Sequence, residues 1–350
     1  MSEHDGAPPI AGMKRSTEPA TSAGPEETMP HVLVAGKLHP SGIALLRDAP
    51  EVTFDYVEEV SEESYAPFIA AADGLVIRTQ PLSAPIIAQA DRLKIVSRHG
   101  VGYDAVDLLA LNGRGIALAI VGDVNSVSVA EHAMLLLLAC AKKLLRADAS
   151  VREGNWTWRN RLEATELSGK RLLIMGFGRT GRQLARYAGV FGMEIRAYDP
   201  YLQAAGWPEG PVAPVDDLAV GLGWADAISV HVPKAACPTI GAGELAAMKP
   251  SAIVVNTARG GVVDEAALLE ALRQGRISAA GLDVFDDEPP LADHPLFGLD
   301  QVILTPHIAG LTAECAERMA ISSVQNVLDF FSGTIDPALI VNKEQLNANS

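Results

Sequence analysis

The chain has few cysteines and no long hydrophobic run. Its three cysteines, Cys140, Cys237 and Cys315, are scattered through 350 residues. This odd number and wide spacing match neither a disulfide framework nor a metal site. We therefore expect reduced thiols, as in a cytoplasmic protein, and no bound metal. The longest apolar run, Ala133 to Ala141, is too short to cross a bilayer.

Positive charge is also scarce. The chain carries 28 Lys and Arg against 43 Asp and Glu, a formal net charge of −15. Nucleic acids and anionic membranes require a basic face, so neither is expected as a partner. No internal repeat is present. Residues 1–29 are rich in Pro, Ala, Ser, Thr, Glu and Gly and lack the apolar core of a secretory signal, which predicts a disordered tail.

From His31 onward, short apolar segments alternate with helical patterns. Continuous apolar character is typical of parallel strands that helices cover on both faces. The first half of the chain has five such segments, at 32–35, 52–54, 75–77, 95–97 and 116–120. The second half has six, at 172–175, 195–198, 227–230, 253–256, 279–282 and 302–304. The alternation predicts an α/β fold with two parallel sheets.

A long helix is predicted between the two series, over about 127–153, with Asn125-Ser126 as its cap. Its segment Ala133 to Ala139 is apolar on every face, which indicates burial all round. The helix is either a core element alone or also the contact with a second subunit. We favour a homodimer through residues 127–153. A last helix is predicted over about 312–331.

A Gly-x-Gly-x-x-Gly motif, Gly176 to Gly181, follows the segment 172–175 and opens a helical pattern. Gly176 permits a tight turn, Gly178 lets the backbone approach a pyrophosphate, and Gly181 allows close packing of helix and strand. The helix N-terminus attracts phosphates. Asp199 lies 18 residues after Gly181, where a carboxylate can accept the ribose hydroxyls and repel a 2′-phosphate. The motif therefore predicts an NAD site.

Three polar side chains follow successive strands of the second series: Arg259, Glu288 and His307. Ligands of open α/β sheets bind at the carboxyl ends of strands, so these residues should converge beside the nicotinamide. A guanidinium can grip carboxylate and carbonyl oxygens, and an imidazole can supply a proton. A carboxylate can orient that imidazole and favour its charged form. Each residue alone is common in loops, but together they predict hydride transfer to a 2-oxo acid.

With these motifs, the chain resembles the D-isomer-specific 2-hydroxyacid dehydrogenases, which include 3-phosphoglycerate dehydrogenases and hydroxypyruvate reductases. The likeness covers about residues 31–345 and includes Asn256-Thr-Ala-Arg259-Gly-Gly and Pro306-His307-Ile-Ala-Gly310. It implies that His307 is the acid/base, Glu288 its partner and Arg259 the substrate anchor. It implies a cofactor site of Gly176, Gly178, Arg179, Thr180, Gly181, Asp199, His231, Val232, Pro233, Thr257, Ala258, Asp283 and Gly310.

The resemblance also implies that Arg78, Val101 and Gly102 bind substrate, with backbone N–H groups of residues 98–104 facing its carboxylate. The expected architecture is two doubly wound parallel-sheet domains. A Rossmann NAD-binding domain, residues 126–310, would be inserted into a flavodoxin-like substrate domain, residues 30–125 and 311–345.

The expected function is NAD-dependent oxidation or reduction of a small D-2-hydroxy or 2-oxo acid, such as 3-phosphoglycerate, hydroxypyruvate or glyoxylate. An alternative is an NADH-sensing binding protein, because the C-terminal-binding corepressors share the fold and similar site residues. Turnover on simple 2-oxo acids would separate the two.

Overall fold

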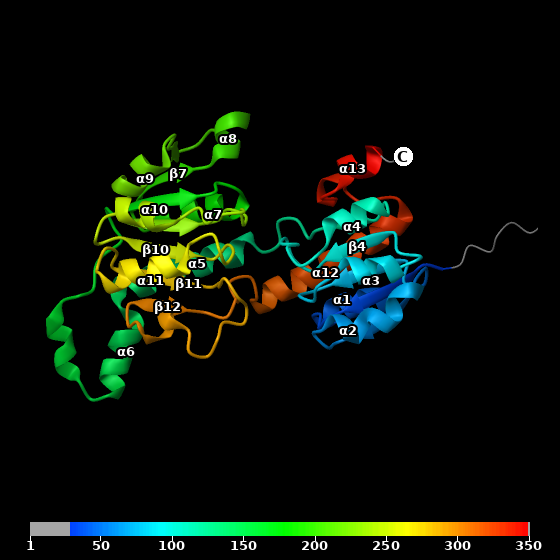
Figure 1. Cartoon of the computed structure of the whole chain (residues 1–350), viewed down its shortest axis with the longest axis horizontal. Coiled ribbons are helices and arrows are strands. Elements are labelled where there is room, and N and C mark those ends of the chain that lie inside the picture. Colours follow the sequence, from blue (N-terminus) through cyan, green and yellow to red (C-terminus); the bar gives the residue numbers. More distant parts are fainter. Residues whose placement is uncertain (1–28, 349–350) are drawn as a thin grey trace, which may run out of the picture.

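The computed structural model describes residues 29–348, which form two α/β bodies that the chain connects twice (Figure 1). The tail expected over residues 1–29 lies, apart from Met29, outside the described residues. The two connections are the segments 120–125 and 308–312.

The first body is built on a five-stranded parallel sheet in the order β2-β1-β3-β4-β5. Each predicted strand is present: β1 His31–Ala35, β2 Thr53–Val57, β3 Gly74–Ile77, β4 Ile95–Arg98 and β5 Ala117–Ala119. Alternate residues of β1 enter two separate cores, one on each face of the sheet. The helices that follow the strands are α1 Pro40–Arg47, α2 Glu62–Tyr65, α3 Ala84–Gln89 and α4 Leu108–Gly113, with a 3-10 helix at Ala66–Ala71.

The second body is built on a seven-stranded parallel sheet in the order β12-β11-β10-β9-β6-β7-β8. The six predicted strands are β6 Arg171–Met175, β7 Glu194–Tyr198, β9 Ala227–Val230, β10 Ile253–Asn256, β11 Ala279–Leu282 and β12 Val302–Leu304. A seventh strand, β8 Ala213–Pro214, was not predicted, because two residues at a sheet edge are too few to show a hydrophobic pattern. The covering helices are α7 Arg179–Val190, α8 Pro200–Ala205, α9 Leu218–Trp224, α10 Ala242–Ala247 and α11 Glu265–Arg273, with a 3-10 helix at Pro295–Gly298.

The helix predicted over 127–153 is wrong as a single element. It is divided into α5 Ser126–Lys142 and α6 Leu144–Arg152 by Lys143, whose φ of +53° is left-handed. Burial explains the division, because α5 lies within the core while α6 leaves the body with mainly exposed side chains. Figure 1 shows α6 on a projecting arm that continues into a 3-10 helix at Trp156–Arg161. The expected Asn125 side-chain cap is also absent.

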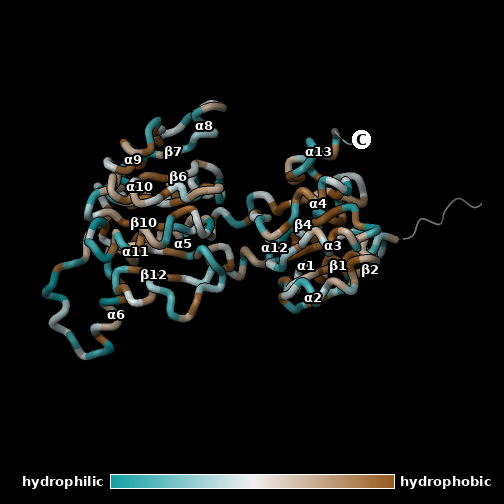
Figure 2. Tube along the Cα trace, in the orientation of Figure 1, coloured by the Kyte–Doolittle hydropathy of each residue, from teal (hydrophilic) through white to brown (hydrophobic). Residues whose placement is uncertain are grey.

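The chain ends in the first body. Helix α12, Ala313–Ser332, confirms the helix predicted over 312–331 and packs on α1 and β4 (Figure 1). Contrary to the prediction, it is not the last helix, because α13, Lys343–Ala348, follows it. The buried Asn342 side chain accepts a hydrogen bond from Leu118 N and donates to Ile116 O, which fixes the C-terminal segment to β5. This segment includes a 3-10 helix at Pro337–Leu339 and α13 Lys343–Ala348. Figure 2 shows the hydrophobic residues concentrated along the strands of both sheets. Among the described residues, no helix has the length and apolar character to span a membrane.

Candidate functional site

The glycine-rich turn has the geometry that a dinucleotide requires. Gly176 has a φ of +89°, and a Cβ there would lie 2.6 Å from the His231 carbonyl oxygen. A Cβ on Gly181 would overlap the Gly176 carbonyl oxygen, so helix α7 can approach β6 only with glycine. A Cβ on Gly178 would meet no atom within 4 Å, and no side chain caps the N-terminus of α7. Free helix N–H groups facing open space fit a pyrophosphate.

Asp199 follows β7, as its predicted role requires. Its carboxylate accepts hydrogen bonds from Phe177 N at 2.8 Å and from Leu202 N at 3.1 Å. It therefore ties the glycine-rich turn to the start of α8, which it caps. Each carboxylate oxygen can accept a second hydrogen bond, so the geometry leaves room for ribose hydroxyls.

His307 and Glu288 form a close pair. His307 Nδ1 lies 2.7 Å from Glu288 Oε2, while Glu288 Oε1 accepts a hydrogen bond from Phe285 N at 3.1 Å. Burial alone would raise the pKa of the Glu288 carboxyl. The hydrogen bonds from His307 and Phe285, with the charges of His307 and Arg259, outweigh burial and lower that pKa below its usual value. Glu288 is therefore ionised near neutral pH.

The loop that carries His307 is held by Asp283, whose side chain is completely buried. Its carboxylate accepts hydrogen bonds from Ile308 N, Ala309 N and the Thr305 hydroxyl, at 2.6 to 2.9 Å. These contacts support the left-handed backbone of His307, with a φ of +51°. Since Thr305 uses its proton on Asp283, its oxygen accepts from Nε2 of His132 on α5, 2.9 Å away.

Arg259, three residues after the end of β10, reaches across to the first body. Its Nε donates to Asp104 Oδ2 at 2.8 Å, and its Nη1 donates to the Ala258 carbonyl at 2.6 Å. A Cβ on Gly102 would overlap the guanidinium, so this loop passes close to Arg259 only because residue 102 is glycine. Burial alone would raise the pKa of the Asp104 carboxyl. The hydrogen bond and charge of Arg259 lower it by more than burial raises it, so the pKa lies below its usual value.

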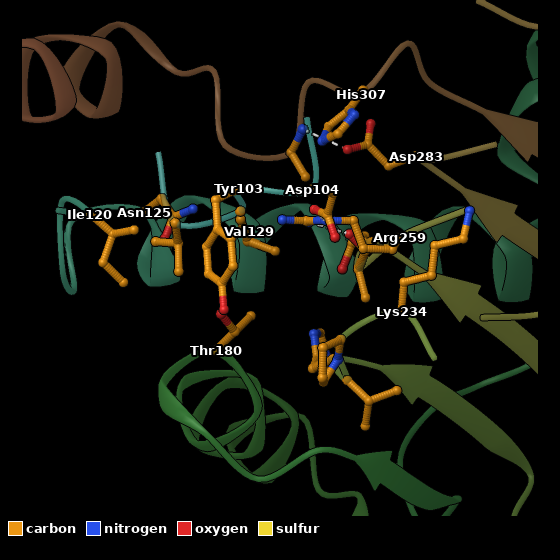
Figure 3. Close-up of a pocket in the computed structure, with 18 residues that line it drawn as sticks. Tyr103, Asp104, Ile120, Asn125, Val129, Thr180, Lys234, Arg259, Asp283 and His307 are labelled. Carbon is orange, nitrogen blue, oxygen red and sulfur yellow. Dashed lines mark hydrogen bonds and ion pairs between the residues drawn. The ribbon is translucent and has the colours of Figure 1, made fainter. Parts of the chain in front are cut away.

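Adjoining cavities bring most of the predicted residues together between the two bodies. One of about 530 Å³ (Figure 3) is lined by Val101, Gly102, Thr180, His231, Val232, Pro233, Thr257, Ala258, Arg259, Asp283 and His307. Another of about 560 Å³ shares Arg259 and His307 with it and adds Arg78, Glu288 and Gly310. A third of about 310 Å³ is lined by Gly178, Arg179, Thr180 and Gly181. Gly176 and Asp199 line none of these three cavities.

Four basic side chains, Arg78, Arg98, Lys234 and Arg259, line the second of these cavities. Three carboxylates, of Asp104, Asp286 and Glu288, line it as well. Burial, followed by repulsion from Arg259, lowers the pKa of Arg98 to about 10, which leaves it charged at neutral pH. His99 behaves differently, because burial and the neighbouring arginines lower its pKa to about 4 and keep it neutral. The cavity is therefore suited to an anion.

Sequence reasoning missed several residues of this region. Lys234 stands one position after the predicted Val232 and Pro233, so the same strand-end argument could have included it. Figure 3 shows Tyr103 pointing toward Thr180 and Asp104 beside Arg259, although the residues of each pair are far apart in the chain. No local pattern indicates them. The same holds for His132, which looks like one polar position on a core helix.

The buried Thr257 hydroxyl has no hydrogen-bond partner among the described residues and lies in the first cavity. It is available to a ligand, as are the first N–H groups of α7, which no side chain caps. Three features define an NAD-binding protein of the α/β class. They are the strand order of the seven-stranded sheet, the glycine-rich turn, and the adjoining set of Arg259, Glu288 and His307.

Comparison with known proteins identifies the family. Residues 134–309 match the model of the D-isomer specific 2-hydroxyacid dehydrogenase, NAD binding domain. A hydroxypyruvate reductase of Thermotoga maritima is 40% identical over 79% of this chain and 90% of its own length. The chain belongs to the D-isomer specific 2-hydroxyacid dehydrogenase family, and the resemblance inferred from its motifs is confirmed.

Two further similarities are informative. A D-3-phosphoglycerate dehydrogenase of Mycobacterium tuberculosis is 41% identical over 89% of this chain, and the chain spans 58% of that relative. The crystal structure of a D-lactate dehydrogenase from Aquifex aeolicus, complexed with NAD and lactic acid, superposes with a TM-score of 0.77. That match is 28% identical and covers 89% of this chain and 98% of the other. The predicted pair of doubly wound domains is therefore confirmed.

Proposed function

We propose that this protein is an NAD-dependent oxidoreductase that interconverts a small D-2-hydroxy acid and the corresponding 2-oxo acid. One observation carries the proposal. The His307–Glu288 pair and Arg259 line cavities that adjoin the glycine-rich turn at the N-terminus of α7. A proton donor, a substrate anchor and a dinucleotide site thus meet in one cleft.

The residues then have distinct tasks. Glu288 holds Nδ1 of His307, so Nε2 is the nitrogen that gives or takes the proton at the substrate oxygen. Arg259 binds the carboxylate and orients the carbonyl through its terminal nitrogens. The backbone N–H groups of Val101 and Gly102 face the same carboxylate. Bound NAD would supply or accept the hydride.

For the cofactor, we propose the residues that the sequence indicated. Gly176, Gly178, Arg179, Thr180 and Gly181 would contact the pyrophosphate. Asp199 would bind the ribose hydroxyls and select NAD over NADP. The remaining contacts would come from His231, Val232, Pro233, Thr257, Ala258, Asp283 and Gly310.

The basic side chains of this cavity support an anionic substrate. Arg78 and Arg98 line the same cavity as Arg259, so an acid with a second anionic group, such as 3-phosphoglycerate, would find further basic partners there. Hydroxypyruvate and glyoxylate have a single carboxylate, so Arg259 alone would suffice to bind them. The names of the similar proteins include both kinds of enzyme.

We further propose that the substrate domain comprises residues 30–125 and 311–345, and the NAD-binding domain residues 126–310. The packing of α12 on β4 supports the return of the chain to the first domain. Exposed apolar side chains on α5 and α6 support a homodimer through residues 127–153. A cytoplasmic location is consistent with three free thiols, Cys140, Cys237 and Cys315.

The test is NADH oxidation at 340 nm across a panel of 3-phosphohydroxypyruvate, hydroxypyruvate, glyoxylate and sulfopyruvate, each with NADH and NADPH. We expect turnover with at least one member, faster with NADH. NADH binding without turnover on any member would contradict the proposal and favour the NADH-sensing binding protein.

A further inference from the structure

Asp104 reaches across the interdomain cleft to the proposed substrate anchor. It lies on the loop after β4, in the first body, whereas Arg259 follows β10 in the second. Figure 3 shows the two side chains meeting in the cavity, with Lys234 nearby. Their 2.8 Å contact links loops that are 155 residues apart in the chain.

The hydrogen bonds of Arg259 leave one edge of the guanidinium for a ligand. A guanidinium has five N–H donors in a rigid plane. Nε donates to Asp104, one Nη1 hydrogen goes to the Ala258 carbonyl, and the Nη2 end lies over Gly102. The guanidinium is therefore held at Nε by Asp104 and at Nη1 by the Ala258 carbonyl. The remaining donors, on Nη1 and Nη2, are the ones that a carboxylate can bind as a fork.

We propose that Asp104 is a positioning residue that orients the Arg259 guanidinium toward an anionic substrate. The inference rests on the proposed function, in which Arg259 is the anchor. Asp104 acts by fixing an orientation. Its hydrogen bond with Nε restrains the rotation of the guanidinium plane about the last side-chain bonds of Arg259. Since half-exposed ion pairs contribute little to folding, its loss should affect binding geometry rather than stability.

The experiment compares Asp104→Ala, Asp104→Asn and the control Asp91→Ala. Asp91 also pairs with an arginine of the first body, Arg114, but it lines none of the three cavities. We expect Asp104→Ala to lower kcat/KM for the best 2-oxo acid by about tenfold to a hundredfold, since small misplacements of a binding group cost that much. Asp104→Asn should stay within about threefold of wild type, because its amide oxygen still accepts from Nε. The control should change little.

A second measurement tests the orientation of Arg259 without turnover. Calorimetry measures the affinity of oxalate for the complex of the protein with NADH. We expect weaker oxalate binding in Asp104→Ala, recovery in Asp104→Asn, unchanged NADH binding and a Tm within about 2 °C of wild type. Equal damage in Asp104→Asn and Asp104→Ala would overturn the proposal, because charge rather than geometry would then matter. Tighter oxalate binding or a lower KM in Asp104→Ala would also overturn it, by showing competition with substrate.

The oxalate arm separates this inference from the proposed function. A wild-type protein that binds oxalate but turns over no 2-oxo acid would refute the function, while the variants would still test the role of Asp104. A wild-type protein that binds NADH but neither binds oxalate nor turns over any 2-oxo acid would overturn both.

Discussion

At the residue scale, the contact of Glu288 with Nδ1 leaves Nε2 of His307 as the ring nitrogen available to a ligand. The carboxylate holds Nδ1 at 2.7 Å and is itself ionised, because its pKa is lowered despite partial burial. A carboxyl with a lowered pKa contributes its charge above that pKa and loses it only as the pH falls through it. The pair therefore persists over the neutral and mildly acidic range.

Glu288→Gln should shift the pH profile of the reaction. The amide keeps the shape and a hydrogen-bonding group but removes the charge that favours the imidazolium. Reduction needs the imidazolium as proton donor, so its kcat/KM should begin to decline at a lower pH than in wild type. Oxidation needs neutral imidazole, so its rise should also move to lower pH. Steady-state kinetics across pH 5 to 10 would check this. An unchanged profile would show that Glu288 is only a turn residue before Pro289.

Asp199 has a structural task that its predicted cofactor role did not include. It caps α8 and accepts from Phe177 N. Asp199→Ala should therefore both relax the rejection of NADP and cost about 1 kcal/mol of stability through the lost cap. Asp199→Asn keeps a capping oxygen without the charge, so it should relax the cofactor preference with a smaller stability loss. Kinetics with both cofactors and urea unfolding would measure these effects. A wild-type preference for NADP would contradict the assignment.

At the element scale, the conformation of the loop that carries His307 depends on a buried cluster rather than on its own sequence. Asp283 accepts three hydrogen bonds from the loop, and His132 on α5 donates to the Thr305 hydroxyl. The left-handed backbone of His307 carries a conformational cost that these contacts offset. The position of His307 is thus coupled to α5, the helix that follows the first connection between the two bodies.

Thr305→Val tests this coupling. Valine matches threonine in shape but can neither donate to Asp283 nor accept from His132, which leaves buried polar atoms without a partner. We expect a loss of about 1–3 kcal/mol in the free energy of unfolding and a lower kcat, with little change in NADH affinity. Urea unfolding and kinetics would measure both, with the exposed Thr157→Val as control. A stable variant with normal kcat would show that the loop holds its own shape.

The strands and the helix between the two bodies show why some elements were predictable. Helices cover both faces of each sheet, so their strands are continuous apolar segments that are visible in the sequence. The prediction over 127–153 was wrong in one respect, because apolar content alone does not show that the chain turns out of the core at Lys143. That turn depends on the body that α5 packs into.

At the scale of the whole molecule, α5 and α6 present the apolar surface that the proposed dimer would cover. Leu135 and Leu145 are 51% and 55% exposed. Leu145→Glu would place a charge in that interface, so we expect a shift from dimer to monomer in analytical ultracentrifugation. Leu109→Glu, on α4 of the other body, is a matched control at an exposed leucine and should leave the mass unchanged. A wild-type monomer would refute the dimer.

The sequence by itself determined the α/β class, nearly all strands, the glycine-rich turn and the residues Arg259, Glu288 and His307. These features are local: an apolar strand, a glycine that a turn requires and a polar side chain at a strand end each leave a mark within a few residues. Only the tertiary structure decided the contacts of Asp104 with Arg259 and of His132 with Thr305, and the bend at Lys143. These join segments far apart in the chain, and a hydrogen bond between distant side chains depends on how the sheets and helices pack, which no short stretch of sequence records.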